Sequence, residues 1–217
     1  HDAILSGDGP VKNWAGAAAV DFPSAQSRKI SDEAVIGMEA YKPYGCWRCP
    51  IACGGKLAQK SGKFALELNE GIGHKPEYET LAMFGSNLLN DDLPSIVKVN
   101  EICNNYGMDT ITVAATIGYT IECYENGLIT ADDTDGLAMN WGNAEAIVAL
   151  TEKIGRREGF GEVLADGVKV AWEKLGRKGT EYAVHVQGEE IPAHDPKFTP
   201  GLAMTYYLCA TPGRHTQ

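Results

Sequence analysis

Three cysteines crowd into eight residues in the first quarter of the chain. Cys46, Cys49 and Cys53 follow the spacing C-x2-C-x3-C, and a proline and a pair of glycines in the same stretch allow the backbone to curl. Three thiolates at this spacing can surround one iron–sulfur cluster. Arg48 and Lys56 lie close to them in sequence and favour the ionised thiolate. The spacing therefore predicts three ligands of one cluster on a curled segment of backbone.

Three other interpretations of this motif stay open from the residues alone. Structural zinc prefers two pairs of Cys or His ligands, and the chain has no second pair, although His74 could serve as a distant ligand. The radical-SAM motif has the two spacings in the reverse order. A disulfide with one spare thiol would suit an extracellular chain. We favour the iron–sulfur cluster because the spacing suits cuboidal ligation and the zinc ligands are too few.

The other three cysteines are scattered. Six cysteines in 217 residues are too few for a disulfide scaffold. Cys103 and Cys123 lie on expected apolar helix faces, where a cysteine usually acts as a small hydrophobic residue. A [4Fe–4S] cluster takes four thiolates, and Cys209, beside a loop, is the only local candidate for the fourth.

Apolar residues recur at helical spacing from Glu79 onward, as at Leu81, Phe84 and Leu88. Polar residues and glycines of the kind that begin and end helices frame further helical patterns. We expect helices at about residues 79–89, 94–107, 109–124, 143–157 and 161–175. One alternating stretch predicts a short strand at 181–186, and loops or short irregular structure are expected at 1–45, 191–197 and 211–215. The predicted fold class is mainly α.

The charge balance argues against several kinds of partner. The chain has 19 Lys and Arg against 29 Asp and Glu, so its formal net charge is −10, and its basic residues do not cluster. Nucleic acid or an anionic membrane would repel such a surface. No apolar stretch approaches the roughly 20 residues of a membrane-spanning helix. Because the chain begins at His1 rather than Met, the lack of a visible targeting signal says little.

Seven segments of the sequence, taken in order, resemble the tungsten-containing aldehyde ferredoxin oxidoreductases. They are Ser6–Trp14, Cys46–Cys53, Lys75–Leu81, Asn104–Thr110, Arg156–Gly161, His185–Gly188 and Ile191–Pro196. The resemblance implies a β-rich N-terminal domain and two mainly helical domains, which hold a tungsten bis-pyranopterin next to a [4Fe–4S] cluster. This chain resembles the two helical domains, numbered 2 and 3, with little β structure. We therefore expect a loop-rich segment at 1–45, a helical domain with the cysteine and first pterin motifs at 46–130, and a second helical domain at 131–217 that is incomplete at its C-terminal end.

The resemblance also implies which residues bind the cofactors. It makes Cys46, Cys49 and Cys53 cluster ligands and places the fourth ligand beyond Gln217. The family's first pterin-binding motif, D-x-x-G-L-D, aligns with pterin-contacting residues Asn104, Gly107, Met108 and Asp109. An asparagine at the leading position accepts hydrogen bonds through one oxygen, where a carboxylate offers two. Taken alone, Gly107 is also expected to end a helix.

An acidic residue and a histidine near the metal are implied as well. Glu79 matches the acidic residue, and we expect it to act as general base on water or a hydrated aldehyde. His215 matches the histidine and is expected to hydrogen-bond the substrate. Lys197 takes the place of an arginine. The lysine keeps the positive charge but lacks the planar guanidinium that binds phosphate or carboxylate through two N–H groups. Without the family, Glu79 is equally a carboxylate favoured by a helix dipole, and His215 a loop histidine.

The function implied is oxidation of aldehydes to carboxylic acids with a tungsten or molybdenum bis-pyranopterin, in an anaerobic, cytoplasmic setting. Electrons would pass to ferredoxin or another redox protein, for which Arg28–Lys29 and Arg156–Arg157 are the candidate contacts. One alternative is a related subunit that reduces aromatic acyl thioesters of the benzoyl-CoA type. An alternative of another class is a non-catalytic iron–sulfur or zinc-binding module. A homodimer stays open, but the family's intersubunit metal motif E-x-x-H has no counterpart around Lys98–Glu101.

Overall fold

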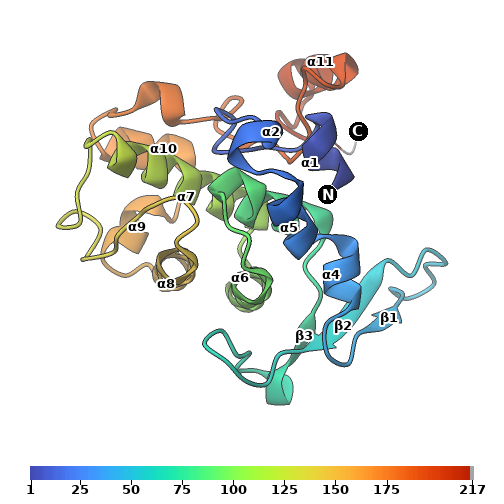
Figure 1. Cartoon of the computed structure of the whole chain (residues 1–217). Coiled ribbons are helices and arrows are strands. Elements are labelled where there is room, and N and C mark those ends of the chain that lie inside the picture. Colours follow the sequence, from blue (N-terminus) through green and yellow to red (C-terminus); the bar gives the residue numbers. More distant parts are fainter. Residues whose placement is uncertain (216–217) are drawn as a thin grey trace.

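Helices account for 47% of the chain and strands for 6% in a computed structural model, which describes residues 1–215. The predicted mainly α fold class is therefore confirmed. The strands lie at one end of the molecule and α8, α9 and α10 at the other (Figure 1). None of the described helices is both long and apolar enough to cross a membrane. The division at residue 130 stays a prediction, and one apolar core contains residues from both sides of it.

The first 41 residues, before the strand that begins at Lys42, are loops joined by short helical segments. These are α1 (Asp2–Ser6), α2 (Ala18–Asp21), α3 (Ser24–Ser27), η1 (Arg28–Ile30) and α4 (Asp32–Ile36). The backbone N–H groups of Lys12 and Asn13 donate to the carbonyl oxygens of Ser86 and Asn87, at 3.1 and 2.8 Å. These bonds tie the first segment to the helical core.

An antiparallel sheet follows, in the order β1 (Lys42–Tyr44), β2 (Gly54–Ala58) and β3 (Ile72–His74), and η2 (Asn69–Gly71) leads into β3. The sequence patterns do not predict this sheet, because its short strands contain Gly, Pro and Lys, which strands usually avoid. The ring of Tyr44 lies over Gly54, where a Cβ atom would be 2.7 Å from the ring. Glycine is therefore required at this position for the two strands to pair.

The middle of the core consists of α5 (Tyr78–Phe84), η3 (Ser86–Leu88), α6 (Leu93–Tyr106) and α7 (Thr110–Glu125). The carboxylates of Asp92 and Asp109 accept hydrogen bonds from backbone N–H groups in the first turns of α6 and α7, which caps both helices. Gly107 ends α6 with φ 68°, the left-handed conformation that favours glycine. The helices predicted at 94–107 and 109–124 are confirmed together with their caps.

After α7, α8 (Ala144–Arg156) packs against α6, and α9 (Phe160–Leu164) and α10 (Val168–Lys174) complete this end of the molecule. The sequence predicts one helix over 161–175, but the helix is interrupted at Gly167, whose φ is 89°. The Glu190 carboxylate accepts a hydrogen bond from the Val168 N–H at 2.6 Å. The carboxylate of a residue distant in sequence therefore accepts a backbone N–H in the first turn of α10, which begins as a separate helix.

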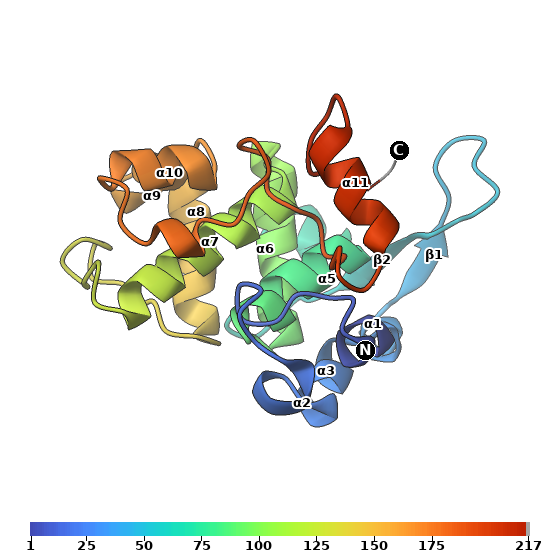
Figure 2. The ribbon, with the colours of Figure 1, turned by 90° about the horizontal axis from the view of Figure 1, so that it is seen from above.

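The region after α10 differs most from the sequence-based prediction. The strand expected at 181–186 is wrong, because η4 (Thr180–Tyr182) occupies its first half and only an isolated bridge joins Val186 to Glu189. The last stretch passes from the end that holds α9 and α10 to α11 (Pro200–Leu208), as Figure 2 shows. The sequence does not predict α11, because exposed Met204, Tyr207 and Leu208 leave it without a one-sided apolar pattern.

A buried ion pair joins α6 to the loop before β3. Lys98 Nζ lies 2.8 Å from Glu101 Oε2 and 2.9 Å from Glu67 Oε1, and the Glu101 carboxylate also accepts from the N–H groups of Glu67 and Leu68. Lys98 and Glu101 are 8% and 9% exposed, whereas the Glu67 side chain is 81% exposed. Burial opposes the charged form of Lys98, but the two carboxylates offset it and raise the pKa of the ammonium group. Lys98 and Glu101, where the family's intersubunit motif would lie, are thus both engaged in a contact within this chain.

Three of the four basic residues considered as ferredoxin contacts already face carboxylates. Lys29 Nζ lies 2.6 Å from Asp91 Oδ2, and Arg156 Nε lies 2.8 Å from Glu152 Oε1, while Arg157 contacts Glu162 and Asp166. Opposite charges this close largely cancel the potential that would attract an acidic protein. These three residues therefore add little to a basic patch.

Asp166 lies between two cations and gives the fold a pH-dependent contribution. Arg157 Nη2 donates to its Oδ1 at 2.5 Å and Lys174 Nζ to its Oδ2 at 3.1 Å, which lowers the pKa of the Asp166 carboxyl to about 2. A carboxylate with a lowered pKa stabilises the fold above its unfolded pKa of about 3.9 and loses that contribution as the pH falls towards the folded value.

We therefore expect Asp166→Asn to lower the thermal unfolding midpoint at pH 6, and the difference from the wild type to shrink steadily between pH 5 and pH 3. Differential scanning calorimetry across this range measures it, with the exposed Asp132→Asn as control. A difference that stays constant down to pH 3 would contradict the assignment.

Candidate active site

Three side chains from separate parts of the chain converge beside the first turn of α5. Glu79 lies in that turn, His194 in the loop before α11, and His215 shortly after α11. Glu79 Oε1 lies 3.3 Å from His215 Nε2 and 3.6 Å from His194 Nε2. The structure therefore brings together Glu79 and His215, which were predicted from the sequence, and adds a second imidazole that was not.

Asp8 holds this second imidazole from behind. Its Oδ2 lies 2.9 Å from His194 Nδ1, and its carbonyl oxygen accepts the N–H of Asp195 at 2.6 Å. Asp8 and His194 were not predicted as site residues, although both lie in segments that carry the family resemblance. Polar residues in Pro- and Gly-punctuated loops were the available signal, but nothing in the sequence pairs two loops so far apart.

Glu79 has the most perturbed environment of this cluster. Burial raises the pKa of its carboxyl, and the nearby charge of Asp109 adds to the rise. The Ala193 N–H, which donates to Glu79 Oε2 at 2.7 Å, and the two imidazoles oppose it. Glu79 Oε1 is buried and accepts no hydrogen bond. A carboxylate with a raised pKa and one oxygen that accepts no hydrogen bond is suited to take up a proton.

Two tyrosines fix the loop that carries His194. The Tyr78 hydroxyl donates to the Ala193 carbonyl oxygen at 2.7 Å, and the Tyr206 hydroxyl donates to the His194 carbonyl oxygen at 3.0 Å. Burial raises the pKa of both phenols, so they remain neutral donors. The Tyr78 ring centroid also lies 5.1 Å from that of His194. The loop is therefore held from α5 on one side and from α11 on the other.

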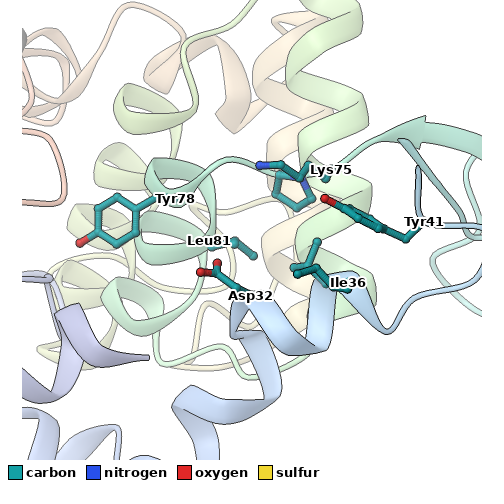
Figure 3. A pocket seen from close by; sticks show the side chains of 8 residues that line it. Asp32, Ile36, Tyr41, Lys75, Tyr78 and Leu81 are labelled. Atoms are coloured by element: carbon teal, nitrogen blue, oxygen red, sulfur yellow. The ribbon is translucent and has the colours of Figure 1, made fainter. Parts of the chain in front are cut away.

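A cavity of about 220 Å³ lies on the other side of Tyr78. Figure 3 shows Tyr41 and Lys75 facing Ile36, with Leu81 and Asp32 lying towards Tyr78. Glu79 and the two histidines do not line it. This cavity is thus separate from the cluster around Glu79.

The three predicted cluster ligands lie on the loop between β1 and β2, and all three are exposed. The Cys49 N–H donates to the Cys46 carbonyl oxygen at 2.9 Å, and Gly45 packs so closely that a Cβ atom there would lie 3.0 Å from the Cys49 carbonyl oxygen. The loop is therefore curled, as the sequence predicts. The sulfur atoms do not all lie within 4.8 Å of one another, whereas ligands of one tetrahedral zinc would be about 3.8 Å apart.

The remaining cysteines occupy different environments. Cys103 and Cys123 are fully buried, as predicted for small hydrophobic residues, and burial raises the pKa of their thiols to about 12 and about 11. The Cys209 sulfur contacts the Thr211 hydroxyl at 3.6 Å, and the Thr211 N–H lowers the pKa of the thiol. No disulfide joins any of the six cysteines, all of which lie in the described part of the chain.

Of the residues predicted to contact the pterin, Asn104 lies in the last turn of α6, and Gly107, Met108 and Asp109 form the turn between α6 and α7. Asn104, Gly107 and Asp109 are exposed, and Met108 is half-buried. Asp109 Oδ2 accepts the Thr112 N–H at 2.9 Å, so this oxygen is already engaged as a helix cap. The Thr80 hydroxyl donates to the Thr110 hydroxyl at 3.0 Å, so the turn lies beside the start of α5 and borders the candidate site.

An open cavity of about 420 Å³ extends from this turn to the sheet. It is lined by Asn104, Asn100, Glu77, Lys75, His74 and Tyr44. The Tyr44 hydroxyl and His74 Nδ1 lie 2.8 Å apart. One ring nitrogen of His74, which was considered above as a distant zinc ligand, is therefore already hydrogen-bonded. The cavity therefore connects the base of the cysteine loop with the predicted pterin turn.

Lys197 lies outside the cluster around Glu79. It is exposed, and its backbone N–H donates to Asp195 Oδ1 at 2.7 Å. The structure thus places this predicted cofactor-binding residue on the same loop as His194, with its cation in solvent.

Comparison with known proteins identifies a matching family and several relatives of this chain. Residues 4–217 match a family described as aldehyde ferredoxin oxidoreductase, domains 2 and 3. The tungsten-containing aldehyde ferredoxin oxidoreductase of Pyrococcus abyssi is 36% identical over 179 residues, which are 81% of this chain and 28% of that protein. That of Pyrococcus furiosus is 34% identical over 198 residues, 91% of this chain and 30% of that protein. The chain thus spans less than a third of the length of these relatives.

A solved structure shares the fold. The active-site complex of benzoyl coenzyme A reductase with 1,5-dienoyl-CoA matches 94% of this chain and 30% of its own, with a TM-score of 0.71 and 19% identity. At this level of identity the likeness describes the arrangement of the backbone.

Proposed function

Because the chain belongs to the aldehyde ferredoxin oxidoreductase family, we propose that it works as part of an oxidoreductase that converts aldehydes to carboxylic acids. The cofactors would be a tungsten or molybdenum bis-pyranopterin and a [4Fe–4S] cluster, with ferredoxin or another redox protein as electron acceptor. The observation that carries the proposal is the convergence of Glu79 and His215, whose Oε1 and Nε2 atoms lie 3.3 Å apart.

The residues fit these cofactors on two observations. Glu79 Oε1 is buried and accepts no hydrogen bond, although two imidazoles lie close to it, so a lone pair remains for a bound group or substrate. Three exposed, free thiols lie on one curled loop, and thiolates are the ligands that hold iron–sulfur clusters. We propose that Cys46, Cys49 and Cys53 hold the cluster, and that Asn104, Gly107, Met108 and Asp109 contact the pterin with Lys197 nearby.

Glu79 would act as the general base. When bound, the metal–pterin group accepts the two electrons released as the aldehyde becomes a carboxylic acid. Glu79 Oε1 removes a proton from the water that adds to the carbonyl carbon, and its raised pKa makes it a stronger base than an exposed glutamate. His215 Nε2 hydrogen-bonds the substrate oxygen, and the Ala193 N–H keeps Glu79 in place through Oε2.

Metal analysis and an aldehyde assay test the proposal. The intact protein, purified without oxygen, is expected to contain about four iron atoms per cluster with tungsten or molybdenum, and to reduce ferredoxin or a low-potential dye when given an aldehyde. Zinc alone, without iron, tungsten or molybdenum, would instead support a non-catalytic binding module and end the enzyme proposal.

The second candidate is reduction of an aromatic acyl thioester. The shared fold with the benzoyl coenzyme A reductase complex favours it, since the same scaffold can run a two-electron reaction in the opposite sense. Supplying a benzoyl thioester and a low-potential reductant to the same preparation separates the two. Turnover of the thioester without aldehyde oxidation would replace the first candidate with the second.

A further inference from the structure

We propose that Asp8 and His194 form a proton-accepting pair behind Glu79, so that a proton taken up by Glu79 passes to His194 Nε2. The inference rests on the proposed function, because it assigns the next step of the proton that Glu79 removes. Neither residue touches the reacting atoms directly, so both are positioning residues that act through Glu79.

His194 is held both at its ring and at its backbone. Asp8 Oδ2 lies 2.9 Å from His194 Nδ1, and the Asp195 N–H donates to the Asp8 carbonyl oxygen. The Tyr206 hydroxyl donates to the His194 carbonyl oxygen at 3.0 Å. A ring fixed in this way presents one defined nitrogen to Glu79.

The contact with Asp8 selects one tautomer of the His194 ring. A carboxylate only accepts hydrogen bonds, so Nδ1 of His194 carries the proton that bonds to Asp8. In the neutral ring, Nε2 then keeps its lone pair and faces Glu79 Oε1 at 3.6 Å. This distance exceeds a hydrogen bond, but such contacts commonly tighten once substrate is bound. When Glu79 is protonated, His194 Nε2 is thus a proton acceptor beside its buried oxygen.

His215 lies slightly nearer to Glu79 than His194 does, but the two histidines differ in their other partners. Asp8 gives His194 a second carboxylate, and this carboxylate stabilises the imidazolium that forms when Nε2 gains a proton. Among the described residues, the only carboxylate in an ion pair with His215 is Glu79 itself. The positive charge is therefore better accommodated on His194, which leaves His215 to the substrate.

The other groups that face His194 do not compete for the proton. Tyr78 lies against its ring and Tyr206 against its carbonyl oxygen, and burial raises the pKa of both phenols. The ring of His215 lies 5.2 Å from that of His194. The charged partners of His194 are thus Asp8 and Glu79, one at each ring nitrogen.

The proton balance is simple. An aldehyde and water give a carboxylic acid, two electrons and two protons. The electrons would pass to the metal–pterin group of the proposed function as the aldehyde C–H bond breaks, and the hydrogen of that bond leaves to solvent as the second proton. One O–H bond of water breaks as Glu79 Oε1 gains the proton. That O–H bond then breaks as the N–H bond forms at His194 Nε2, while the Nδ1 proton stays with Asp8. Glu79 is thereby returned to its basic form for the next turnover.

Variants of the intact protein with its cofactors test the kinetic part. We expect His194→Gln and Asp8→Asn each to lower kcat by about 10²-fold, with KM changed by less than about threefold, because neither residue contacts the substrate. Asp8→Glu keeps a carboxylate and is expected to recover part of the loss. Asp2→Asn, an exposed aspartate of α1, is the matched control and should leave kcat unchanged. If His194→Gln keeps wild-type kcat, the proton-accepting role is wrong.

Nitrogen-15 NMR of the histidine rings provides a readout that does not require turnover. The five histidines are labelled, and the His194 signals are identified by their loss in His194→Gln. We expect the Nδ1–H tautomer in the wild type and the Nε2–H tautomer in Asp8→Asn, whose amide can donate to Nδ1. An Nε2–H tautomer in the wild type would overturn the pair. Failure of the proposed function would appear separately, as a wild-type protein that does not oxidise aldehydes.

Discussion

Replacing Glu79 with glutamine is expected to lower kcat for aldehyde oxidation by about 10³-fold, since general-base catalysis by a positioned side chain typically contributes about 10²- to 10⁴-fold. Glutamine keeps the size of the side chain and can still accept the Ala193 N–H through its amide oxygen. It cannot take up a proton at the position of Oε1. The expected change therefore falls on the chemistry rather than on the fold.

Steady-state kinetics of the anaerobically purified variant, together with its tungsten or molybdenum content, measure this effect. Glu70→Gln changes an exposed glutamate of η2 and is the matched control, with expected wild-type kcat. Near-normal turnover of Glu79→Gln with the metal bound would show that another group acts as base. Loss of the metal in the variant would instead assign Glu79 to cofactor retention.

Replacing Glu101 with alanine is expected to destabilise the fold by about 3 kcal/mol, because breaking a buried ion pair leaves an uncompensated charge. Lys98 would keep only its exposed partner Glu67, and the N–H groups of Glu67 and Leu68 would lose their acceptor. Chemical denaturation, read by circular dichroism, measures the difference in free energy of unfolding.

Two further variants isolate the cause. Glu67→Gln alters the exposed partner of the same lysine and is expected to cost less than about 1 kcal/mol, as surface pairs usually do. The double variant Lys98→Met with Glu101→Leu removes both buried charges and should recover the part of the loss that comes from the unpaired charge, while the N–H groups of Glu67 and Leu68 still lack their acceptor. If the double variant is as unstable as Glu101→Ala, the unpaired charge is not the cause.

The helices of the middle of the chain could be predicted because their signals are local. Asp92, Asp109 and Gly107 mark helix boundaries in the sequence, and the structure places them there as caps. The spacing of Cys46, Cys49 and Cys53 likewise predicted a curled loop. Each of these features depends on residues within a few positions of one another, which a linear sequence displays directly.

The sheet and the break before α10 could not be predicted, because they depend on contacts outside each segment. The helix α11 could not be predicted because its exposed apolar residues leave no one-sided pattern. β1 pairs with β2 through Tyr44 over Gly54, and α10 begins separately where Glu190 accepts the Val168 N–H. The same reason explains why Asp8 and His194 were missed. Their hydrogen bond joins positions separated by 186 residues, and no periodicity or spacing reveals such a pair.

The layout of the candidate active site has a consequence for how the chain acquires it. Glu79 sits on a core helix, but Asp8 comes from the first residues, and His194 and His215 come from the last quarter. Contacts of high sequence separation require the largest loop closure and form late in folding. A partly folded chain can therefore contain the helical core and still lack a working site. Catalytic competence then reports that both ends of the chain have docked, which secondary structure content alone does not.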